Sequence, residues 1–339
     1  MSNEILPPLE DLLATTRVVS LPLNTRFRGV ETREALLFEG PHGWAEFSPF
    51  VEYDDTEAAA WLDAAIDFAW RPQPSACRTA IPVNATVPAV PADRVGEVLA
   101  RFDGCRTAKV KVAERGQLLA DDVARVRAVR EAMGAEGRIR LDANGAWNLD
   151  EAEHAVHALA EFDLEYLEQP CGSIDELIEL RRRIRYLGIP IAADESVRKA
   201  EDPVAVVTAG AADLVVVKVQ PLGGVRRALR VVAKAGVPAV VSSALDTSVG
   251  LGMGVALAAA LPELSYDCGL GTASLLAVDV TADPLVAGSG EVPVRRVTPD
   301  RELLVEHAAD HERSTWWRDR LRRCHAVLAA RVSRPAAPR

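Results

Sequence analysis

Four short apolar runs of this chain each end in a charged residue, at nearly constant spacing. They lead into Asp142, Glu168, Asp194 and Lys218, at intervals of 26, 26 and 24 residues. A further short run, KVK at 109–111, ends 31 residues before Asp142. A strand, a crossover helix and the return to the next parallel strand take roughly 30 residues. We therefore expect five successive parallel strands, each with a charged residue at its carboxyl end.

The stretch from 81 to 267 alternates strand-like and helix-like segments throughout. Its eight strand candidates are 81–87, 107–112, 138–142, 164–168, 189–193, 213–218, 238–242 and a shorter one near 264–267. Such alternation is typical of a parallel sheet covered by helices, and eight strands favour a closed barrel. No G-x-G-x-x-G follows the first strand, which argues against a dinucleotide-binding sheet. We predict an α/β fold, a (β/α)7β TIM-like barrel with an α+β capping domain.

The parts outside the barrel differ from it in pattern. Residues 1–78 are expected to form the α+β capping domain, with strands near 17–22 and 34–38, a polar loop at 24–29 between them and a helix at 56–70. The barrel is expected at 79–275. The C-terminal segment, 276–339, alternates weakly and then shows a helical pattern over 302–330. We expect this last segment to return to the capping domain.

The three acids at the strand ends predict a metal site. In a barrel, the carboxyl ends of the strands face one shared cavity, so Asp142, Glu168 and Asp194 are expected to converge. Carboxylates in a dry cavity repel one another unless a cation neutralises them. An all-oxygen set of ligands suits Mg²⁺, with Mn²⁺ as a substitute.

The use of lysine is selective in this chain. Only five of the 39 basic residues are lysine, at 109, 111, 199, 218 and 234. Three of these fall in predicted buried strands, where a charge is expensive. Lysine, unlike arginine, can give up its proton when it is desolvated. Lys111 and Lys218 therefore become candidates for acid–base groups beside the ion, acting on the proton α to a substrate carboxylate. The alternative for each lysine is an ion pair at the mouth of the barrel.

Polar residues near the strand ends are candidates for substrate contacts. Asn144 follows a predicted ligand by two residues, where a supporting or a purely structural role explains it equally well. Ser242 and Ser243 end the seventh strand candidate. Together with the backbone amides before a helix that begins near Ser248, they suit a substrate carboxylate. A turn followed by a helix cap accounts for the same residues equally well.

Composition excludes several classes of partner. The net charge is −10 and no basic patch is evident, which argues against binding of nucleic acid or of anionic membrane surfaces. No apolar run approaches the length of a membrane span, and the first 13 residues lack the features of a signal peptide. The five scattered cysteines read as reduced thiols of a cytoplasmic protein. The expected partner is a small carboxylate substrate, and no particular oligomeric state follows from the sequence.

Several motifs resemble those of a known superfamily. They are KVK at 109–111, LDANGAW at 141–147, EQP at 168–170, ADES at 193–196 and VVKVQPLGG at 216–224. Together they resemble the muconate-lactonising subgroup of the enolase superfamily, over nearly the whole chain. The resemblance implies the barrel with its cap, and Mg²⁺ bound by Asp142, Glu168 and Asp194. It also implies that Lys111 and Lys218 are the acid–base pair.

Within that subgroup, three further stretches are similar to the o-succinylbenzoate synthases of the actinobacterial type: NTRFRG at 24–29, GWAEFSPF at 43–50 and SSALDTSVGL at 242–251. That family dehydrates 2-succinyl-6-hydroxy-2,4-cyclohexadiene-1-carboxylate in menaquinone biosynthesis, by syn β-elimination through an enediolate. The resemblance implies that Lys111 removes the α proton and then protonates the departing hydroxyl, while Lys218 stays cationic. It further implies substrate contacts from Lys109, Arg26 and Arg28, with the two arginines meeting the succinyl carboxylate. A solvated loop explains the two arginines equally well.

Two other functions stay open at this point. N-succinylamino acid racemases and dipeptide epimerases carry the same lysines and acids, because two lysines flanking an enediolate serve equally well for 1,1-proton transfer. A non-catalytic barrel that serves as a binding or assembly protein is expected to have lost some of the five charged positions, and this chain retains all of them.

Overall fold

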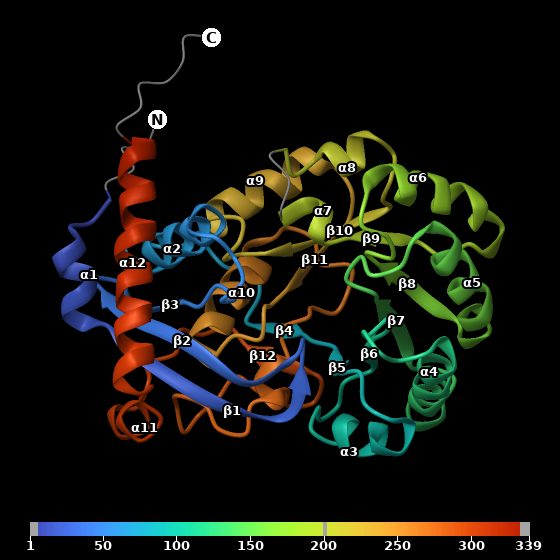
Figure 1. The fold of residues 1–339 in the computed structure, drawn as a ribbon, viewed down its shortest axis with the longest axis horizontal. Helices are drawn as coiled ribbons and strands as arrows, with labels where there is room; N and C mark the ends of the chain where they lie inside the picture. The colour runs from blue at the N-terminus through green and yellow to red at the C-terminus, as the bar shows by residue number, and fades with distance from the viewer. Residues whose placement is uncertain (1–5, 199–201, 333–339) are drawn as a thin grey trace, which may run out of the picture.

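The computed structural model describes residues 6–198 and 202–332, and two sheets organise this part of the chain (Figure 1). One is a three-stranded antiparallel sheet near the N-terminus, and the other is a curled parallel sheet of seven strands. The predicted α/β class is confirmed. Lys199 and the last seven residues lie outside the described residues.

The parallel sheet forms the wall of a barrel. Its strands follow chain order: β5 (Ala85–Val87), β6 (Thr107–Lys111), β7 (Arg138–Asp142), β8 (Leu164–Glu168), β9 (Ile191–Ala193), β10 (Leu214–Lys218) and β11 (Ala239–Ser242). Single bridges from Cys268 to Val83 and from Gly269 to Ser242 join the two edges. The eighth strand was expected near 264–267. It is instead reduced to these two residues, which hydrogen-bond to both neighbouring strands.

The first predicted strand, 81–87, is divided in two. Its first half, β4 (Ala80–Pro82), pairs antiparallel with β12 (Glu291–Pro293), and only the second half joins the barrel as β5. A segment from near the C-terminus therefore extends the base of the first barrel strand. The weak alternation of residues 292–297 in the sequence did not indicate that this segment would pair with β4.

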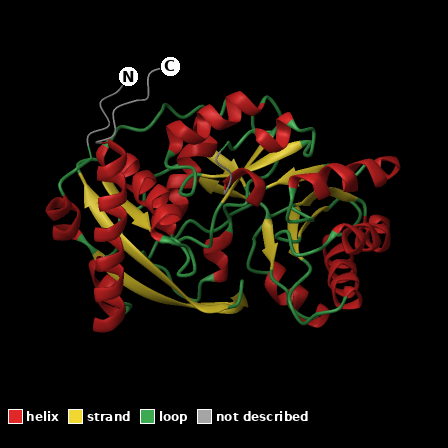
Figure 2. Cartoon of the chain, turned by 45° about the horizontal axis from the view of Figure 1, so that its top comes forward, coloured by secondary structure: helices red, strands yellow, loops and turns green. Residues whose placement is uncertain are grey.

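Helices connect the strands and cover the outside of the barrel (Figure 2). They are α3 (Val95–Leu99), α4 (Leu119–Met133), α5 (Leu149–Leu159), α6 (Ile174–Arg183), α7 (Glu195–Arg198), α8 (Ala205–Thr208), α9 (Val225–Ala235) and α10 (Ser248–Ala260). Local sequence explains the clearest starts: Asn148 and Ser173 accept hydrogen bonds from the first-turn amides of α5 and α6 in capping boxes. Within the described residues, no helix has both the length and the apolar character needed to cross a membrane.

The antiparallel sheet consists of β1 (Arg17–Phe27), β2 (Val30–Gly40) and β3 (Gly43–Phe47). With α1 (Leu9–Thr15), α2 (Asp55–Trp70), α11 (Arg301–Glu306) and α12 (His311–Val332) it is called the cap below. The predicted C-terminal helix, 302–330, is interrupted between α11 and α12. The reason is pairing with β1: Ser20 N donates to His307 O and Ala309 N donates to Val18 O, both at 2.9 Å.

The predicted polar loop at 24–29 is for the most part a strand. β1 runs to Phe27 and β2 begins at Val30, so only Arg28 and Gly29 form the turn, here called the hairpin tip. Both have positive φ, 49° and 79°, as a two-residue hairpin turn requires. The loop prediction was wrong because the polar residues 24–26 belong to strand β1 although their side chains are exposed or half-buried, while Arg26 and Arg28 line the cavity described below.

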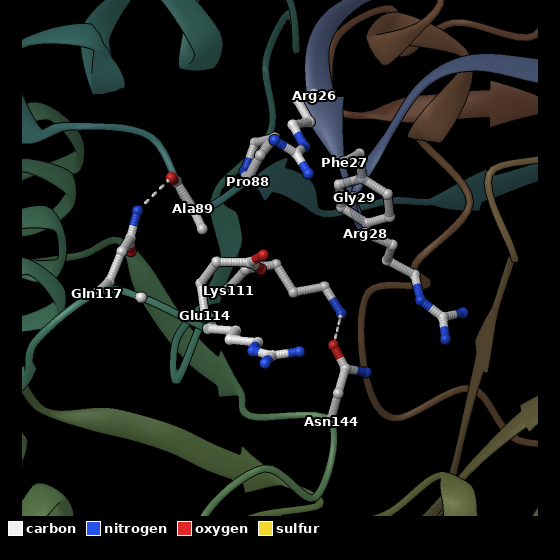
Figure 3. A pocket seen from close by; sticks show the side chains of 12 residues that line it. Arg26, Phe27, Arg28, Gly29, Pro88, Ala89, Lys111, Glu114, Gln117 and Asn144 are labelled. Carbon is white, nitrogen blue, oxygen red and sulfur yellow. Dashed lines mark hydrogen bonds between the residues drawn. The ribbon is translucent and has the colours of Figure 1, made fainter.

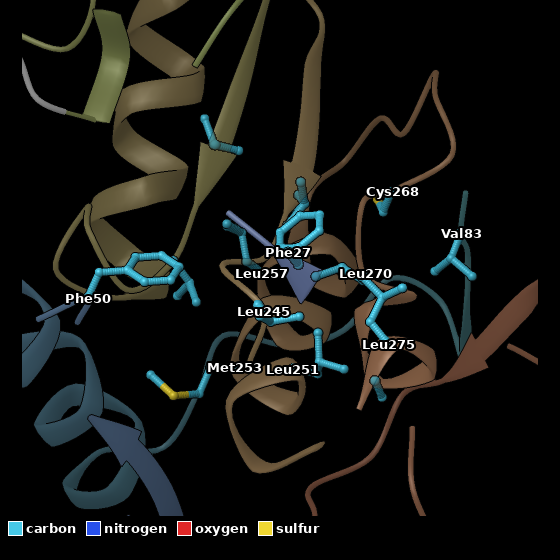
Figure 4. Close-up of a cluster of buried hydrophobic side chains, with 14 of the residues drawn as sticks. Phe27, Phe50, Val83, Leu245, Leu251, Met253, Leu257, Cys268, Leu270 and Leu275 are labelled. Atoms are coloured by element: carbon cyan, nitrogen blue, oxygen red, sulfur yellow. The ribbon is translucent and has the colours of Figure 1, made fainter. Parts of the chain in front are cut away.

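The cap and the barrel meet at the start of α10, beside a cluster of buried apolar side chains (Figure 4). Glu46 of β3 accepts hydrogen bonds from Thr247 N at 3.1 Å and from Gly250 N at 3.2 Å. Asp279 accepts one from Ser248 N at 3.2 Å. Two carboxylates from segments outside the barrel therefore occupy the positive end of a barrel helix, where negative charge is stabilised.

Gly250 makes this close approach feasible, and its replacement by alanine is expected to destabilise the protein by about 1–3 kcal/mol. A Cβ at this position would lie 2.7 Å from the Glu46 carboxyl carbon and 2.8 Å from Asp246 Cβ, so buried groups would have to move. Urea unfolding of Gly250→Ala measures the loss. Gly252→Ala is the matched control in the same helix. Its Cβ would meet only Arg295 O at 3.6 Å, so it should be neutral or slightly stabilising. Equal effects of the two substitutions would refute this explanation.

Candidate active site

The strand register brings the predicted charged residues together at one end of the barrel. Lys111 of β6 pairs with Asp142 of β7, and Asp142 pairs with Glu168 of β8. Asp194 directly follows β9, and Lys218 ends β10. All five therefore lie at the carboxyl ends of consecutive strands, where barrels of this type place their active sites.

Three lysines contact three carboxylates in this cluster. Lys111 Nζ lies 2.5 Å from Asp142 Oδ2 and 2.8 Å from Asn144 Oδ1. Lys109 Nζ lies 3.1 Å from both Asp142 Oδ2 and Glu168 Oε1. Lys218 Nζ donates to Asp194 Oδ2. These charges are nearly all shielded from solvent, since each of the three acids is at most 1% exposed. Opposite charges balance in a dry environment.

Burial and neighbouring charge shift the protonation of these groups. Burial, reinforced by the negative charge of Asp142, raises the pKa of Glu168 to about 8. Burial opposes ionisation of Asp142 as well, but the adjacent Lys111 and Lys109 ammonium groups hold the pKa of its carboxyl well below the usual range. Burial, together with the charge of Lys109, lowers the pKa of Lys111. The cluster is therefore strongly coupled electrostatically.

The donor set of this cluster fits a hard divalent cation. Asp142, Glu168 and Asp194 offer carboxylate oxygens from three consecutive strands, which is the ligand type that such ions take. In the present arrangement of the side chains, each of the three carboxylates contacts a lysine. Within 6–198 and 202–332, accordingly, no three His, Cys, Asp or Glu side chains form a group that could hold a metal ion. Burial, more than the charge of Asp142, raises the pKa of Glu168, so a cation beside this carboxyl would favour its ionised form.

A cavity of about 280 Å³ opens beside this cluster (Figure 3). The hairpin tip and the segments after β5, β6 and β7 line it, including Arg26, Arg28, Lys111 and Asn144. Four of the residues expected from the sequence therefore share one cavity. Sequence reasoning missed three others there: Phe27, whose ring centroid lies 5.5 Å from Lys111 Nζ, and Arg115 and Gln117 in the segment after β6. The last two gave no signal beyond following a lysine-bearing strand.

A smaller, adjoining cavity brings together both predicted catalytic lysines. It is lined by Lys109, Lys111 and Lys218, and also by Ser242 and Ser243. Arg28 and Leu245 contribute to its wall as well. The two lysines at the ends of β6 and β10 therefore face a shared space from separate strands.

At the start of α10 the structure shows the turn and helix cap that were the second explanation of this stretch, with Thr247 as the cap, and the amides there are not open to a substrate. Carboxylates of the protein occupy them, Glu46 at Thr247 N and Gly250 N, and Asp279 at Ser248 N. The nearby Ser243 hydroxyl donates to Gly269 O at 2.6 Å. The sequence could not show this, because Glu46 and Asp279 are distant along the chain from the amides that they bind.

Gln169 is a further site residue to which sequence reasoning gave no role. It is fully buried, and its Oε1 accepts hydrogen bonds from Asp194 N at 3.0 Å and Ser196 N at 3.1 Å. Its Nε2 donates to Cys171 O at 2.9 Å. This side chain joins the end of β8 to the segment that carries Asp194. Two signals could have found it: its position immediately after Glu168, and its place in the EQP motif at 168–170.

Comparison with known proteins agrees with this architecture. Residues 93–300 match the family model described as enolase C-terminal domain-like, and residues 18–69 match the one described as enolase N-terminal domain-like. Among solved structures, muconate lactonizing enzyme from Pseudomonas fluorescens superposes with a TM-score of 0.73. The sequences are 21% identical, and the match covers 87% of this chain and 98% of that protein. At that identity the likeness concerns the fold.

Curated relatives are much more similar in sequence. An o-succinylbenzoate synthase from Mycolicibacterium smegmatis is 55% identical over 329 residues, which cover 97% of this chain and 100% of the relative. An o-succinylbenzoate synthase from Mycobacterium tuberculosis is 55% identical over 325 residues, covering 96% and 98%. The chain belongs to the enolase superfamily and, within it, to the family of o-succinylbenzoate synthases.

Proposed function

We propose that this chain catalyses the Mg²⁺-dependent dehydration of 2-succinyl-6-hydroxy-2,4-cyclohexadiene-1-carboxylate to o-succinylbenzoate, as a hydro-lyase of menaquinone biosynthesis. The observation that carries the proposal is 55% identity to o-succinylbenzoate synthases over nearly the full chain, joined to a cavity lined by Lys111 and Lys218. Residues 1–78 would form the N-terminal capping domain, 79–275 the catalytic barrel, and 276–339 the C-terminal segment that returns to the capping domain. A cytoplasmic location remains a prediction from composition.

The metal ligands in this proposal are Asp142, Glu168 and Asp194. Mg²⁺ held there, or Mn²⁺ in its place, would neutralise the charge that develops on the ring carboxylate when its α proton leaves. The three acids lie on consecutive strands at one level of the barrel, which supports their acting as one ligand set. Lys109 and Lys218, which contact these acids, would supply positive charge toward the substrate carboxylate.

The proton in this proposal moves through Lys111. Its neutral amine takes the proton from the carbon α to the ring carboxylate, and the electrons of that C–H bond move onto the carboxylate to give the enediolate. Those electrons then form the new ring double bond as the C–O bond breaks, and Lys111 returns the proton to the departing hydroxyl, which leaves as water. Lys218 stays protonated throughout and stabilises the enediolate from its own strand. One base suffices because the proton and the hydroxyl leave from the same face.

The second carboxylate of the substrate, on the succinyl group, requires a cation at the outer end of the cavity. Arg26 and Arg28 line that end, and we assign them to this carboxylate. Lys109 and Asn144 would orient the reacting end through their contacts with Glu168 and Lys111. Ser242 and Ser243 would complete the wall beside Lys218.

The test follows the ultraviolet change as the ring becomes aromatic, with purified protein, the cyclohexadiene substrate and Mg²⁺. We expect turnover that chelation by EDTA removes and that added Mg²⁺ restores. Absence of turnover from folded, Mg²⁺-loaded protein would overturn the proposal. Racemisation of N-succinyl amino acids, or epimerisation of dipeptides, by the same two lysines is the alternative that such a result would favour.

Replacing Gln169 with alanine is expected to weaken Mg²⁺ binding by about 10- to 100-fold. The substitution removes the acceptor for Asp194 N and Ser196 N, so the segment that carries one ligand keeps only its backbone pairing with β8. Titration calorimetry with Mg²⁺ alone measures the effect. Gln73→Ala is the matched control, because Gln73 donates to Asp67 O and Arg71 O, away from the site. Unchanged Mg²⁺ affinity in folded Gln169→Ala would contradict the assigned role.

A further inference from the structure

A buried arginine of the cap lies between the hairpin tip and the turn that precedes α10. Arg33 of β2 is only 4% exposed. Its Nε donates to Leu245 O at 2.9 Å, and its Nη2 donates to Ser48 O and, at 2.9 Å, to Ser48 Oγ. Leu245 belongs to the wall of the smaller cavity. One guanidinium therefore joins a strand of the cap to a segment of the barrel that faces the substrate space.

The turn that Arg33 holds has a strained backbone. Leu245 has φ +63°, a left-handed conformation that a non-glycine residue adopts only when its surroundings enforce it. Besides Arg33, the enforcing contacts come from Asp246, which accepts hydrogen bonds from Ala244 N at 3.3 Å and Gln220 Nε2 at 3.0 Å. Gln220 follows Lys218 by two residues. The conformation of the turn therefore depends on the cap on one side and on the end of β10 on the other.

The same guanidinium shares an aromatic ring with the hairpin tip. Arg33 Cζ lies 4.6 Å from the centroid of the Phe50 ring, and Arg28 Cζ lies 4.4 Å from it. Phe50 is 4% exposed and belongs to the buried cluster that also contains Leu245 (Figure 4). Cation–π contacts of this kind fix a guanidinium by the face of the ring. Arg28, which lines both cavities, is thereby linked to Arg33.

Two buried carboxylates, Glu46 and Asp246, lie close enough to Arg33 for its positive charge to stabilise them. Burial raises the pKa of Glu46 to about 7 and also raises that of Asp246, while the positive charge of Arg33 acts on both in the opposite direction. The Ser48 hydroxyl donates to Glu46 Oε1 at 2.5 Å and accepts from Arg33. The arginine is therefore held by charge as well as by hydrogen bonds, and its position is well defined.

We propose that Arg33 and Phe50 are positioning residues that fix two walls of the substrate cavity relative to each other. One wall is Arg28 at the hairpin tip, and the other is the turn at 244–246 beside Lys218. The inference rests on the proposed function for its kinetic consequence. Arg33 and Phe50 are not among the residues that line the two cavities. Their effect on the substrate therefore passes through Arg28 and Leu245, which do line them.

The variants Arg33→Lys and Phe50→Leu test this coupling in the full-length protein. Lysine keeps the charge but cannot donate to Leu245 O and Ser48 with one planar group. Leucine keeps an apolar side chain and removes the ring. Because both variants displace cavity walls and leave Lys111 in place, we expect KM to rise at least about tenfold while kcat stays within about threefold. The double variant should be no worse than Arg33→Lys alone, because both act on the same contacts.

A second readout does not depend on turnover. Trypsin cleaves after arginine, and a hairpin tip released from Phe50 should be cut after Arg26 or Arg28 at least about tenfold faster than in the parent protein. Arg313→Lys is the matched control. Arg313 forms a two-point ion pair with Glu34, at 2.8 and 2.6 Å, and is not among the residues that line the two cavities. It should leave both KM and the cleavage rate unchanged.

The outcomes separate the two proposals. If the parent protein dehydrates the substrate but neither folded variant changes KM or tryptic cleavage, the coupling is refuted and the function stands. If the parent protein does not dehydrate the substrate, the function is refuted, and the cleavage rates still decide the coupling. Should Arg33→Lys fail to fold, as near-ultraviolet circular dichroism would reveal, Phe50→Leu carries the same test.

Discussion

Replacing Lys111 with alanine is expected to lower kcat for dehydration by about 10³-fold. In the proposed reaction this one amine is both the base for the α proton and the acid for the departing hydroxyl, and a positioned acid–base group contributes about 10²–10⁴-fold. Its Nζ lies 2.8 Å from Asn144 Oδ1 and lines both cavities, so no other lysine side chain of the described residues can take its position without moving a strand end. Initial rates of o-succinylbenzoate formation, separated chromatographically, measure the loss.

Two further variants make this result specific. Lys234→Ala removes a lysine whose side chain is 66% exposed and pairs with Asp202 at 3.3 Å, and it should leave kcat unchanged. Lys218→Arg keeps a permanent positive charge opposite Lys111. A one-base elimination needs only that charge, so Lys218→Arg should retain far more activity than Lys111→Arg. Equal losses in the two arginine variants would contradict the one-base mechanism and favour proton transfer by both lysines.

The charged end of the barrel was predictable because it depends on local pattern and spacing. Lys111, Asp142 and Glu168 each close a short apolar run, and parallel strands place such residues side by side. The same reasoning predicted that helices would alternate with these strands. It failed for the eighth strand, because Cys268 and Gly269 close the barrel with only two residues, too few to form a recognisable pattern.

What the sequence could not indicate are contacts between segments far apart in the chain. Glu46 binds the first amides of α10, about 200 residues later, and Arg33 reaches Leu245 in the same region. The stretch around Glu46 and Phe50 was noticed only for its family likeness, with no role attached. Polar residues that serve such contacts look like surface residues when no partner is in view, and the arm carrying Arg26 was mistaken for a loop in the same way.

Replacing Arg140 with leucine is expected to cost about 3–5 kcal/mol of unfolding free energy, the largest stability effect that we predict. Arg140 of β7 is fully buried inside the barrel, two residues before Asp142. Its Nε donates to Glu165 Oε2 at 2.5 Å and its Nη1 donates to Asp267 O at 2.6 Å. It also lies 4.8 Å from the centroid of the Tyr166 ring. Leucine would leave a largely buried carboxylate without its closest partner.

Urea unfolding measures this loss, and the neighbouring arginine on the same strand provides the control. The Arg138 side chain is 46% exposed and pairs with Asp267 Oδ2 at 2.7 Å. Arg138→Leu should therefore cost less than about 1 kcal/mol, as exposed ion pairs do. Glu165→Gln combined with Arg140→Leu should recover part of the loss, since it removes a carboxylate left with only the more distant Arg138, at 3.8 Å. Similar losses from Arg138→Leu and Arg140→Leu would show that the buried ion pair does not stabilise the barrel.

Proton nuclear magnetic resonance in deuterated water tests the proposed function most directly. Parent protein and Mg²⁺ are given the cyclohexadiene substrate and an N-succinyl amino acid in one tube, so that both reactions are followed together. Our account predicts rapid appearance of the aromatic signals of o-succinylbenzoate, with far slower loss of the amino acid α-proton signal. Loss of the α-proton signal without aromatic product would contradict it, and would assign the same lysines and acids to a racemase.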